Sequence, residues 1–237
     1  MSLFLKLVLA HLIGDFPLQT NKIFLIKIRY KWGTLLHSSI IGAVTLLMAY
    51  TYLGNPEVIG VIVILWIFHA MQDRAKIGYN TDIARDNVWT FLFDQAVHIA
   101  AIGLMCYIVR NARPTFPLAK PDWFATIYNR DSLITAGIWL VVVSYGGVIF
   151  LAYIMKSLKG EKGHSIKLPD PKIKYLTMFE RTAIALLIFS GGWPLALVPL
   201  ALAPSSVLCW KGGLSPAGLA AGWAYAAAVG ALMRLTV

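Results

Sequence analysis

Charged residues are scarce in this chain. Lys, Arg, Asp and Glu make up 14% of its 237 residues, whereas an ordinary soluble domain carries about a quarter. Hydrophobic residues make up 58%, and the mean hydropathy is +0.69. The few charges lie in short stretches between long apolar runs, which excludes an ordinary soluble domain. The runs are continuous rather than alternating in polarity, so they favour membrane helices over the strands of a barrel.

Cysteines and known catalytic signatures are equally scarce. The two cysteines, Cys106 and Cys209, lack the spacing of a disulfide framework, and we expect free thiols. No P-loop, dinucleotide-binding fingerprint or G-x-S-x-G elbow is present. The net charge is +10, yet no basic–aromatic stripe or nucleic-acid-binding motif accompanies it. We therefore expect no nucleic-acid partner.

The apolar runs predict an all-α fold, a polytopic transmembrane helical bundle of about seven spans. The predicted spans are 2–18, 34–53, 56–72, 88–109, 132–155, 177–200 and 214–234, each close to the ~20 residues that a bilayer requires. We interpret the first as a membrane span rather than a cleavable signal, because His11 and Asp15 interrupt it.

The distribution of basic residues predicts the orientation. Thirteen Lys and Arg residues follow the first, third and fifth spans, and five follow the fourth and sixth. By the positive-inside rule, the N-terminus is expected outside and the C-terminus inside, with a basic cytoplasmic loop at about 156–175 that contacts membrane lipid. We divide the chain into a four-helix membrane core, residues 1–110, and three further membrane helices, residues 111–237.

Histidine and aspartate recur at a fixed spacing within the predicted core. Three apolar segments each carry the two residue types four positions apart, which places both side chains on one helix face. The pairs are His11/Asp15, His69/Asp73 and Asp94/His98, and His37 lies in a fourth segment. With the predicted topology, all seven share a depth of one to two helical turns from the cytoplasmic side. Ionisable groups are costly in hydrocarbon, so such a band indicates a functional site.

Imidazole and carboxylate together suit zinc, manganese or iron. Seven candidate ligands exceed the four of one tetrahedral zinc, so either some orient the ligands or two ions share the site. Asp15, Asp73 and Asp94 are the candidate general bases. Four neighbours are candidates for contact with substrate or for orienting the ligands: Gln19, Gln95, Arg74 and Lys76.

Three functions remain open at this stage. The first is a metal-dependent hydrolase that acts on a phosphorylated lipid or isoprenoid at the cytoplasmic leaflet. The second is a transporter of divalent metal ions or protons, which predicts polar residues at the membrane midplane. The third is a structural membrane subunit, in which the pairs are helix-stabilising hydrogen bonds or an enclosed metal holds the bundle together.

The motifs HLIGDFPLQ (11–19), His37, HAMQDRAK (69–76) and DQAVH (94–98) resemble a bacterial inner-membrane family, domain of unknown function 3307. Its signature runs HLxGDFxLQ, H, HxxxDxxK, DQxxH. The resemblance covers about the first 110 residues and implies an inner-membrane location; FERTAI (179–184) resembles a helix start in the family's second half. In its histidine and aspartate residues alone, the chain is also similar to membrane-bound metal-dependent hydrolases.

The second half of the chain offers fewer candidates. Glu180 is a further ligand, an ion-pair partner or an acid near a helix N-terminus, and His164 lies in the basic loop. Small residues recur every four positions in the last span, at Gly218, Gly222, Ala226 and Gly230. Such a face allows close helix packing, either in a homodimer or within the bundle.

Overall fold

The computed structural model describes residues 2–80, 87–116, 122–158, 170–210 and 215–237. Every regular element in these ranges is a helix, which confirms the predicted all-α class. Most of the basic loop predicted at 156–175 lies outside the described residues, as does His164.

The chain packs as two compact units, Met1–Ile138 and Trp139–Val237, and the boundary falls within one helix. The units reflect packing alone, so the domain division at residue 110 stays a prediction. Each unit is described by itself below.

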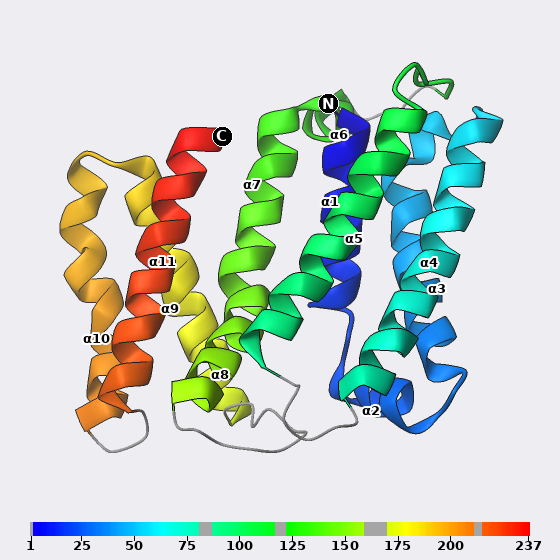
Figure 1. The fold of residues 1–237 in the computed structure, drawn as a ribbon. Coiled ribbons are helices and arrows are strands. Elements are labelled where there is room, and N and C mark those ends of the chain that lie inside the picture. Colours follow the sequence, from blue (N-terminus) through cyan, green and yellow to red (C-terminus); the bar gives the residue numbers. More distant parts are fainter. Residues whose placement is uncertain (1, 81–86, 117–121, 159–169, 211–214) are drawn as a thin grey trace. The chain divides into compact units, whose positions relative to one another are not determined.

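Four helices form the body of the first unit (Figure 1). They are α1 (Ser2–Asp15), α3 (Gly33–Met48), α4 (Pro56–Asn80) and α5 (Val88–Ile108). α3 packs against α1 and α4, and α5 packs against the same two helices, so the four close into a ring. The short elements α2 (Asn21–Arg29), η1 (Tyr50–Tyr52) and α6 (Asp122–Asn129) connect or flank them, and α7 (Asp131–Val141) crosses the unit boundary.

Two glycines allow close helix approaches at the α2 end of this ring. A Cβ atom on Gly14 of α1 would collide with the side chain of Ile41 on α3. A Cβ atom on Gly33, the first residue of α3, would lie 2.7 Å from the Cα atom of Lys27 on α2. The absence of a side chain at these positions therefore lets α1 and α2 pack directly against α3.

None of the residues of α2 is buried. Phe24, Leu25 and Ile28 expose apolar side chains, while Lys22 and Arg29 are exposed basic residues of the same short helix. This combination is typical of a helix that lies in the membrane interface.

The second unit contains the end of α7, a π-helical turn (Val142–Gly146), α8 (Gly147–Leu158), α9 (Pro171–Ser190), η3 (Trp193–Leu197), α10 (Val198–Trp210) and α11 (Pro216–Thr236). Buried side chains of the π turn, α9 and α11 form its core. The π turn leaves backbone carbonyls available to side chains: Arg181 donates to the carbonyl oxygens of Val143 and Ser144, at 3.3 and 3.4 Å, and Tyr225 donates to that of Val142.

The single helix predicted over residues 177–200 is wrong. α9 ends at Ser190, and a second helix, α10, follows from Val198. Gly191 and Gly192 separate the two, with φ of +62° and +63°. Only glycine adopts this backbone conformation readily, so the paired glycines end α9 and redirect the chain.

Five helical stretches among the described residues are long and apolar enough to cross a membrane. They are Pro56–Tyr79, Val88–Ile108, Asp131–Ser157, Trp193–Trp210 and Pro216–Thr236. The predicted spans at 2–18 and 34–53 correspond to helices of 14 and 16 residues. α10 adds a helical stretch that the sequence did not predict, and each added membrane span would move the C-terminus to the other side. The total of seven spans and the side of the C-terminus therefore stay predictions.

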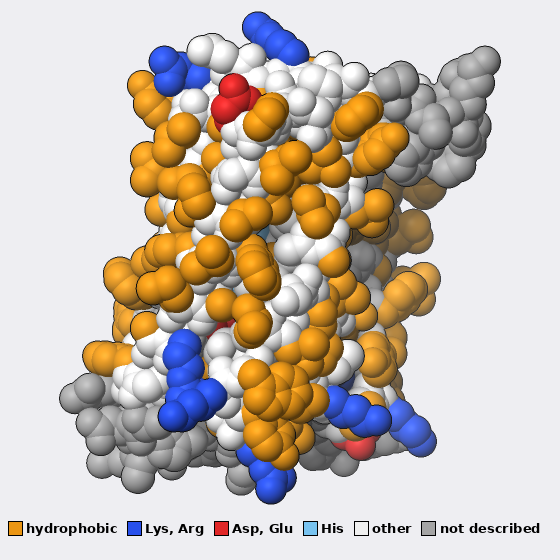
Figure 2. Space-filling view, turned by 90° about the vertical axis from the view of Figure 1, so that its right-hand side faces the viewer, with side chains coloured by type: hydrophobic (Ala, Val, Ile, Leu, Met, Phe, Trp, Pro, Cys, Tyr) orange, Lys and Arg blue, Asp and Glu red, His pale blue; other side chains and the backbone are white. Residues whose placement is uncertain are grey.

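The surface of the molecule fits a membrane environment. Figure 2 shows hydrophobic side chains over the middle of one face, with Lys and Arg side chains at its two ends. A hydrophobic belt between basic ends is what a bilayer requires of a spanning protein.

The small residues of α11 pack within the second unit. Ala226 is fully buried, and a Cβ atom on Gly230 would lie 2.7 Å from the carbonyl oxygen of Ala185 on α9. The part of this face at Ala226 and Gly230 is therefore buried within the second unit, and Gly230 packs against α9. A homodimer stays a prediction.

Candidate metal centre

The four helices of the ring bring all seven predicted His and Asp residues to one site. α1 contributes from its last turns, α3 from near its start, α4 from its C-terminal half, and α5 from its second turn and its midpoint. The residues are His11 and Asp15 (α1), His37 (α3), His69 and Asp73 (α4), and Asp94 and His98 (α5). Each is at most 6% exposed.

Asp15 joins three helices. Its Oδ1 atom lies 3.0 Å from Nε2 of His37 and 3.5 Å from Nε2 of His69. Its Oδ2 atom lies 3.6 Å from Nε2 of His11, the partner four residues away in sequence. The shortest of these contacts is therefore between helices rather than within the i, i+4 pair.

Asp73 pairs with a cation that the sequence analysis did not assign to the site. Nζ of Lys27, on α2, lies 2.8 Å from Oδ2 of Asp73. Nε2 of His69 lies 3.2 Å from the same oxygen, and Nε2 of His37 lies 3.8 Å from it. Lys27 also donates to Oε1 of Gln19 at 3.0 Å, so both side chains lie at the edge of the site.

Asp94 forms the third carboxylate position. Nζ of Lys76 lies 2.7 Å from its Oδ2 atom, and Nε2 of His98 lies 3.7 Å from its Oδ1 atom. Gln95 donates from Nε2 to Oδ2 of Asp15 at 3.1 Å and to Oδ2 of Asp94 at 3.4 Å. One amide thus bridges two carboxylates that lie on different helices.

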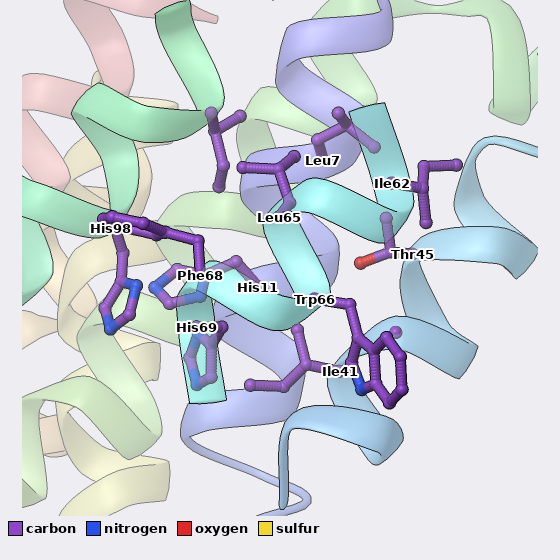
Figure 3. A pocket seen from close by; sticks show the side chains of 12 residues that line it. Leu7, His11, Ile41, Thr45, Ile62, Leu65, Trp66, Phe68, His69 and His98 are labelled. Atoms are coloured by element: carbon purple, nitrogen blue, oxygen red, sulfur yellow. The ribbon is translucent and has the colours of Figure 1, made fainter. Parts of the chain in front are cut away.

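The histidine rings lie around a small internal cavity. The rings of His69 and His98 are stacked, with centroids 4.2 Å apart, and the centroid of His11 is 5.4 Å from the former and 5.0 Å from the latter. A cavity of about 30 Å³ adjoins these three rings and is otherwise lined mainly by apolar side chains such as Leu7 and Ile62 (Figure 3). A space of that size holds one or two waters or ions.

Several ligand-type atoms of the cluster are buried without a hydrogen-bond partner among the described residues. They are the Nε2 atoms of His11, His69 and His98, and Oδ1 of Asp94. Buried polar atoms are almost always paired, and unpaired ones call for an explanation such as an ion. The residues present therefore fit a metal ion.

Three groups of side chains could each hold an ion, with ligand atoms within 4.8 Å of one another. The groups are His11/Asp15/His69, His37/His69/Asp73 and Asp73/Asp94/His98. The second and third share Asp73, whose two oxygens could each contact a different ion. This arrangement is compatible with one ion or with two neighbouring ions.

Two further candidates on α4, Lys76 and Arg74, differ in whether their side chains reach the site. Lys76, one turn beyond Asp73, contacts the site, whereas Arg74 is exposed. Residues i and i+3 share a helix face and residues i and i+1 do not, so the sequence spacing could have separated these two. No comparable signal identifies Lys27, because its approach depends on the packing of α2 against α3.

Glu180 belongs to a separate polar group in the second unit. Its Oε1 atom accepts hydrogen bonds from Oγ of Ser205 at 2.5 Å and from Nε1 of Trp223 at 2.8 Å. These contacts connect α9 with α10 and α11, and they define a role for Glu180 in the packing of its own unit.

The fold and site together define a helical membrane-type protein with a buried histidine–aspartate centre. Residues 3–123 match the family described as "Protein of unknown function (DUF3307)". Because this match covers half of the chain, the protein belongs to that family, which confirms the family that the sequence predicted. No curated protein and no solved structure matches the chain.

Proposed function

We propose that this protein is an integral-membrane, metal-dependent hydrolase that acts on a phosphorylated lipid or isoprenoid. The proposed location is the bacterial inner membrane, with the site at the cytoplasmic leaflet. The observation that carries the proposal is a set of buried ligand atoms of His11, His69, His98 and Asp94 that form no hydrogen bond with any described residue. They lie 3.2–3.7 Å from oppositely charged or polar atoms of the same cluster, whereas a purely hydrogen-bonded core would join such atoms by hydrogen bonds.

The donor set narrows the choice of metal. Imidazole nitrogens and carboxylate oxygens without a nearby thiolate suit zinc, manganese or iron. Two ions held by the two groups that share Asp73 would use five of the seven residues and leave His11 and Asp15 to orient the ligands. One ion would leave more of the residues for that role. Divalent ions in this site would polarise a phosphoester and supply a nucleophile at neutral pH.

The protein's own side chains would supply the remaining functions of a hydrolase. An aspartate oxygen that is not a ligand could accept the proton of the attacking water. The ammonium groups of Lys27 and Lys76 now neutralise Asp73 and Asp94. When a divalent cation takes over that task, both lysines are free to bind the phosphate of a substrate.

A structural metal site is the second candidate, and the burial of the cluster favours it. His37 is fully buried and Asp73 is 2% exposed. An enclosed ion that only holds the ring of helices together would account for such burial, and its removal would unfold the protein. A transporter finds less support, because the cavity that extends the site is lined mainly by apolar side chains.

The deciding experiment is elemental analysis of the detergent-purified protein by mass spectrometry. The parent is compared with the variant His69→Ala/Asp73→Ala and with His164→Ala, which removes the histidine outside the cluster. We expect near-stoichiometric zinc, manganese or iron in the parent and in His164→Ala, and loss of metal from a double variant that still elutes as a folded species.

A negative result is equally clear. If no sample binds metal even after reconstitution, the metal centre is excluded. If metal is present but its removal by a chelator unfolds the parent, the structural site is favoured. If the metal-free protein stays folded, hydrolysis of lipid and isoprenoid phosphates before and after metal loading tests the reaction itself.

A further inference from the structure

A second, much larger pocket adjoins the site between α4 and α5. Its volume is about 590 Å³, and it extends from Gln72 and Asp94 toward Tyr79 and Asn87. Asp94 belongs both to this pocket and to the candidate metal centre. The pocket therefore reaches the carboxylate of Asp94 at the edge of the candidate metal centre.

The walls of the pocket differ in chemistry. Its inner end presents polar groups, with Lys76 and Thr90 beside Asp94. Its outer part presents two large aromatic side chains, Trp89 and Phe93, which are 75% and 68% exposed. Trp and other aromatic residues at such positions commonly lie at the membrane interface, where lipid chains meet headgroups.

The inner end contains a cation that contacts both a buried carboxylate and the space of the pocket. Lys76 is paired with Asp94, yet its side chain is 23% exposed while that of Asp94 is 5% exposed. The lysine therefore lies between the buried carboxylate and the space of the pocket. An anion that enters the pocket meets the ammonium group before it meets the carboxylate, and the three N–H donors of that group can contact both.

We propose that this pocket binds a membrane amphiphile with an anionic phosphate headgroup. Lys76 holds the phosphate, and Trp89 and Phe93 contact the first part of the hydrocarbon chain. The proposal deepens the proposed function and rests on it for the choice of phosphate as the anion. A free phosphate ion would use Lys76 but not the two aromatic residues, so the pocket favours a lipid.

The test is photochemical labelling, which requires no turnover. The full-length protein in micelles of an uncharged alkyl glycoside receives a trace of monoalkyl phosphate that carries a diazirine on its chain. After irradiation, labelled positions are mapped by peptide mass spectrometry. A matched alkyl alcohol probe tests the need for the headgroup, and inorganic phosphate as competitor tests binding of the free anion.

We expect the alkyl phosphate to label the α4 and α5 residues that line the pocket. Lys76→Gln should lower this labelling about tenfold, equivalent to about 1.4 kcal/mol, and Lys76→Arg should retain it. Phe93→Ser, which leaves the ion pair intact, should lower it as well. Lys31→Gln, which removes an exposed lysine of the α2–α3 connection, is the matched control and should label like the parent.

Three results would overturn the inference. They are equal labelling by the alcohol probe, complete competition by inorganic phosphate at the probe's own concentration, and unchanged labelling in both Lys76→Gln and Phe93→Ser. If the protein is labelled but binds no metal, the lipid-binding pocket is supported and the metal-dependent hydrolase is rejected. If the protein hydrolyses its substrate with metal but is not labelled, the hydrolase is supported and the lipid-binding pocket is rejected.

Discussion

Lys27 and Asp73 form an ion pair between the short helix α2 and the long helix α4, with Nζ of Lys27 2.8 Å from Oδ2 of Asp73. The two side chains are 12% and 3% exposed. The pair covers one side of the histidine–aspartate cluster with a cation that belongs to no membrane-spanning helix. A metal ion at Oδ2 of Asp73 would have to displace this ammonium group, so Lys27 and the metal would compete for that oxygen.

Replacement of Lys27 by methionine should destabilise the metal-free protein, because it leaves the carboxylate of Asp73 buried without a cation. The expected loss is about 3 kcal/mol of unfolding free energy, visible as a lower melting temperature. A divalent ion should restore most of this loss in the variant. The control Lys22→Met, at an exposed position of the same helix, should change neither the melting temperature nor the stabilisation by a divalent ion. If the two variants have equal effects, Lys27 and the metal do not compete for Asp73.

Gly14→Ala should force α1 away from α3. The new methyl group would meet the side chain of Ile41, and Asp15 and His37 are the next residues to be separated. We expect a destabilisation of about 1–3 kcal/mol, measured by thermal unfolding, together with weaker metal binding. Gly60→Ala is the matched control in α4, since no atom lies within 4 Å of its added Cβ. Equal stability of the two variants would show that the close approach is unimportant.

In the variant Gln95→Glu, the free energy of unfolding should depend more strongly on bound metal than in the parent. The amide now donates to Asp15 and Asp94, whereas a fourth carboxylate would repel both. We expect lower stability without metal and, because carboxylate count raises cation affinity, binding tighter on the order of tenfold. Titration of manganese followed by thermal shift measures both quantities. Gln95→Met removes the donors without adding charge, and a response like that of the glutamate would exclude the electrostatic cause.

Ser205→Ala should weaken the packing of α10 on α9. It removes the hydroxyl that donates to Oε1 of Glu180 at 2.5 Å, and a hydrogen bond to a carboxyl group contributes about 1–3 kcal/mol. Ser206→Ala is an adjacent control, because that hydroxyl donates to the carbonyl oxygen of Leu202 in its own helix. Thermal unfolding should separate the two variants, and metal content should be unchanged in both.

Local patterns in the sequence predicted much of the first unit. The spacing of four in His11/Asp15, His69/Asp73 and Asp94/His98 places each pair on one helix face, and this holds in the structure for a purely local reason. The long apolar runs likewise predicted the helices of the ring. The break at Gly191 and Gly192 was missed because residues 182–200 carry no charge, and hydropathy alone does not register a reversal of the backbone.

The sequence by itself determined that these residues form apolar helices with histidine and aspartate on defined faces, because helix periodicity depends only on neighbours along the chain. Tertiary packing decided which groups from different helices meet. The pairing of Asp15 with His37 requires the close approach at Gly14, and the pairing of Lys27 with Asp73 requires α2 to pack against α3 at Gly33. Such contacts join residues distant in sequence, so their geometry depends on how the helices pack.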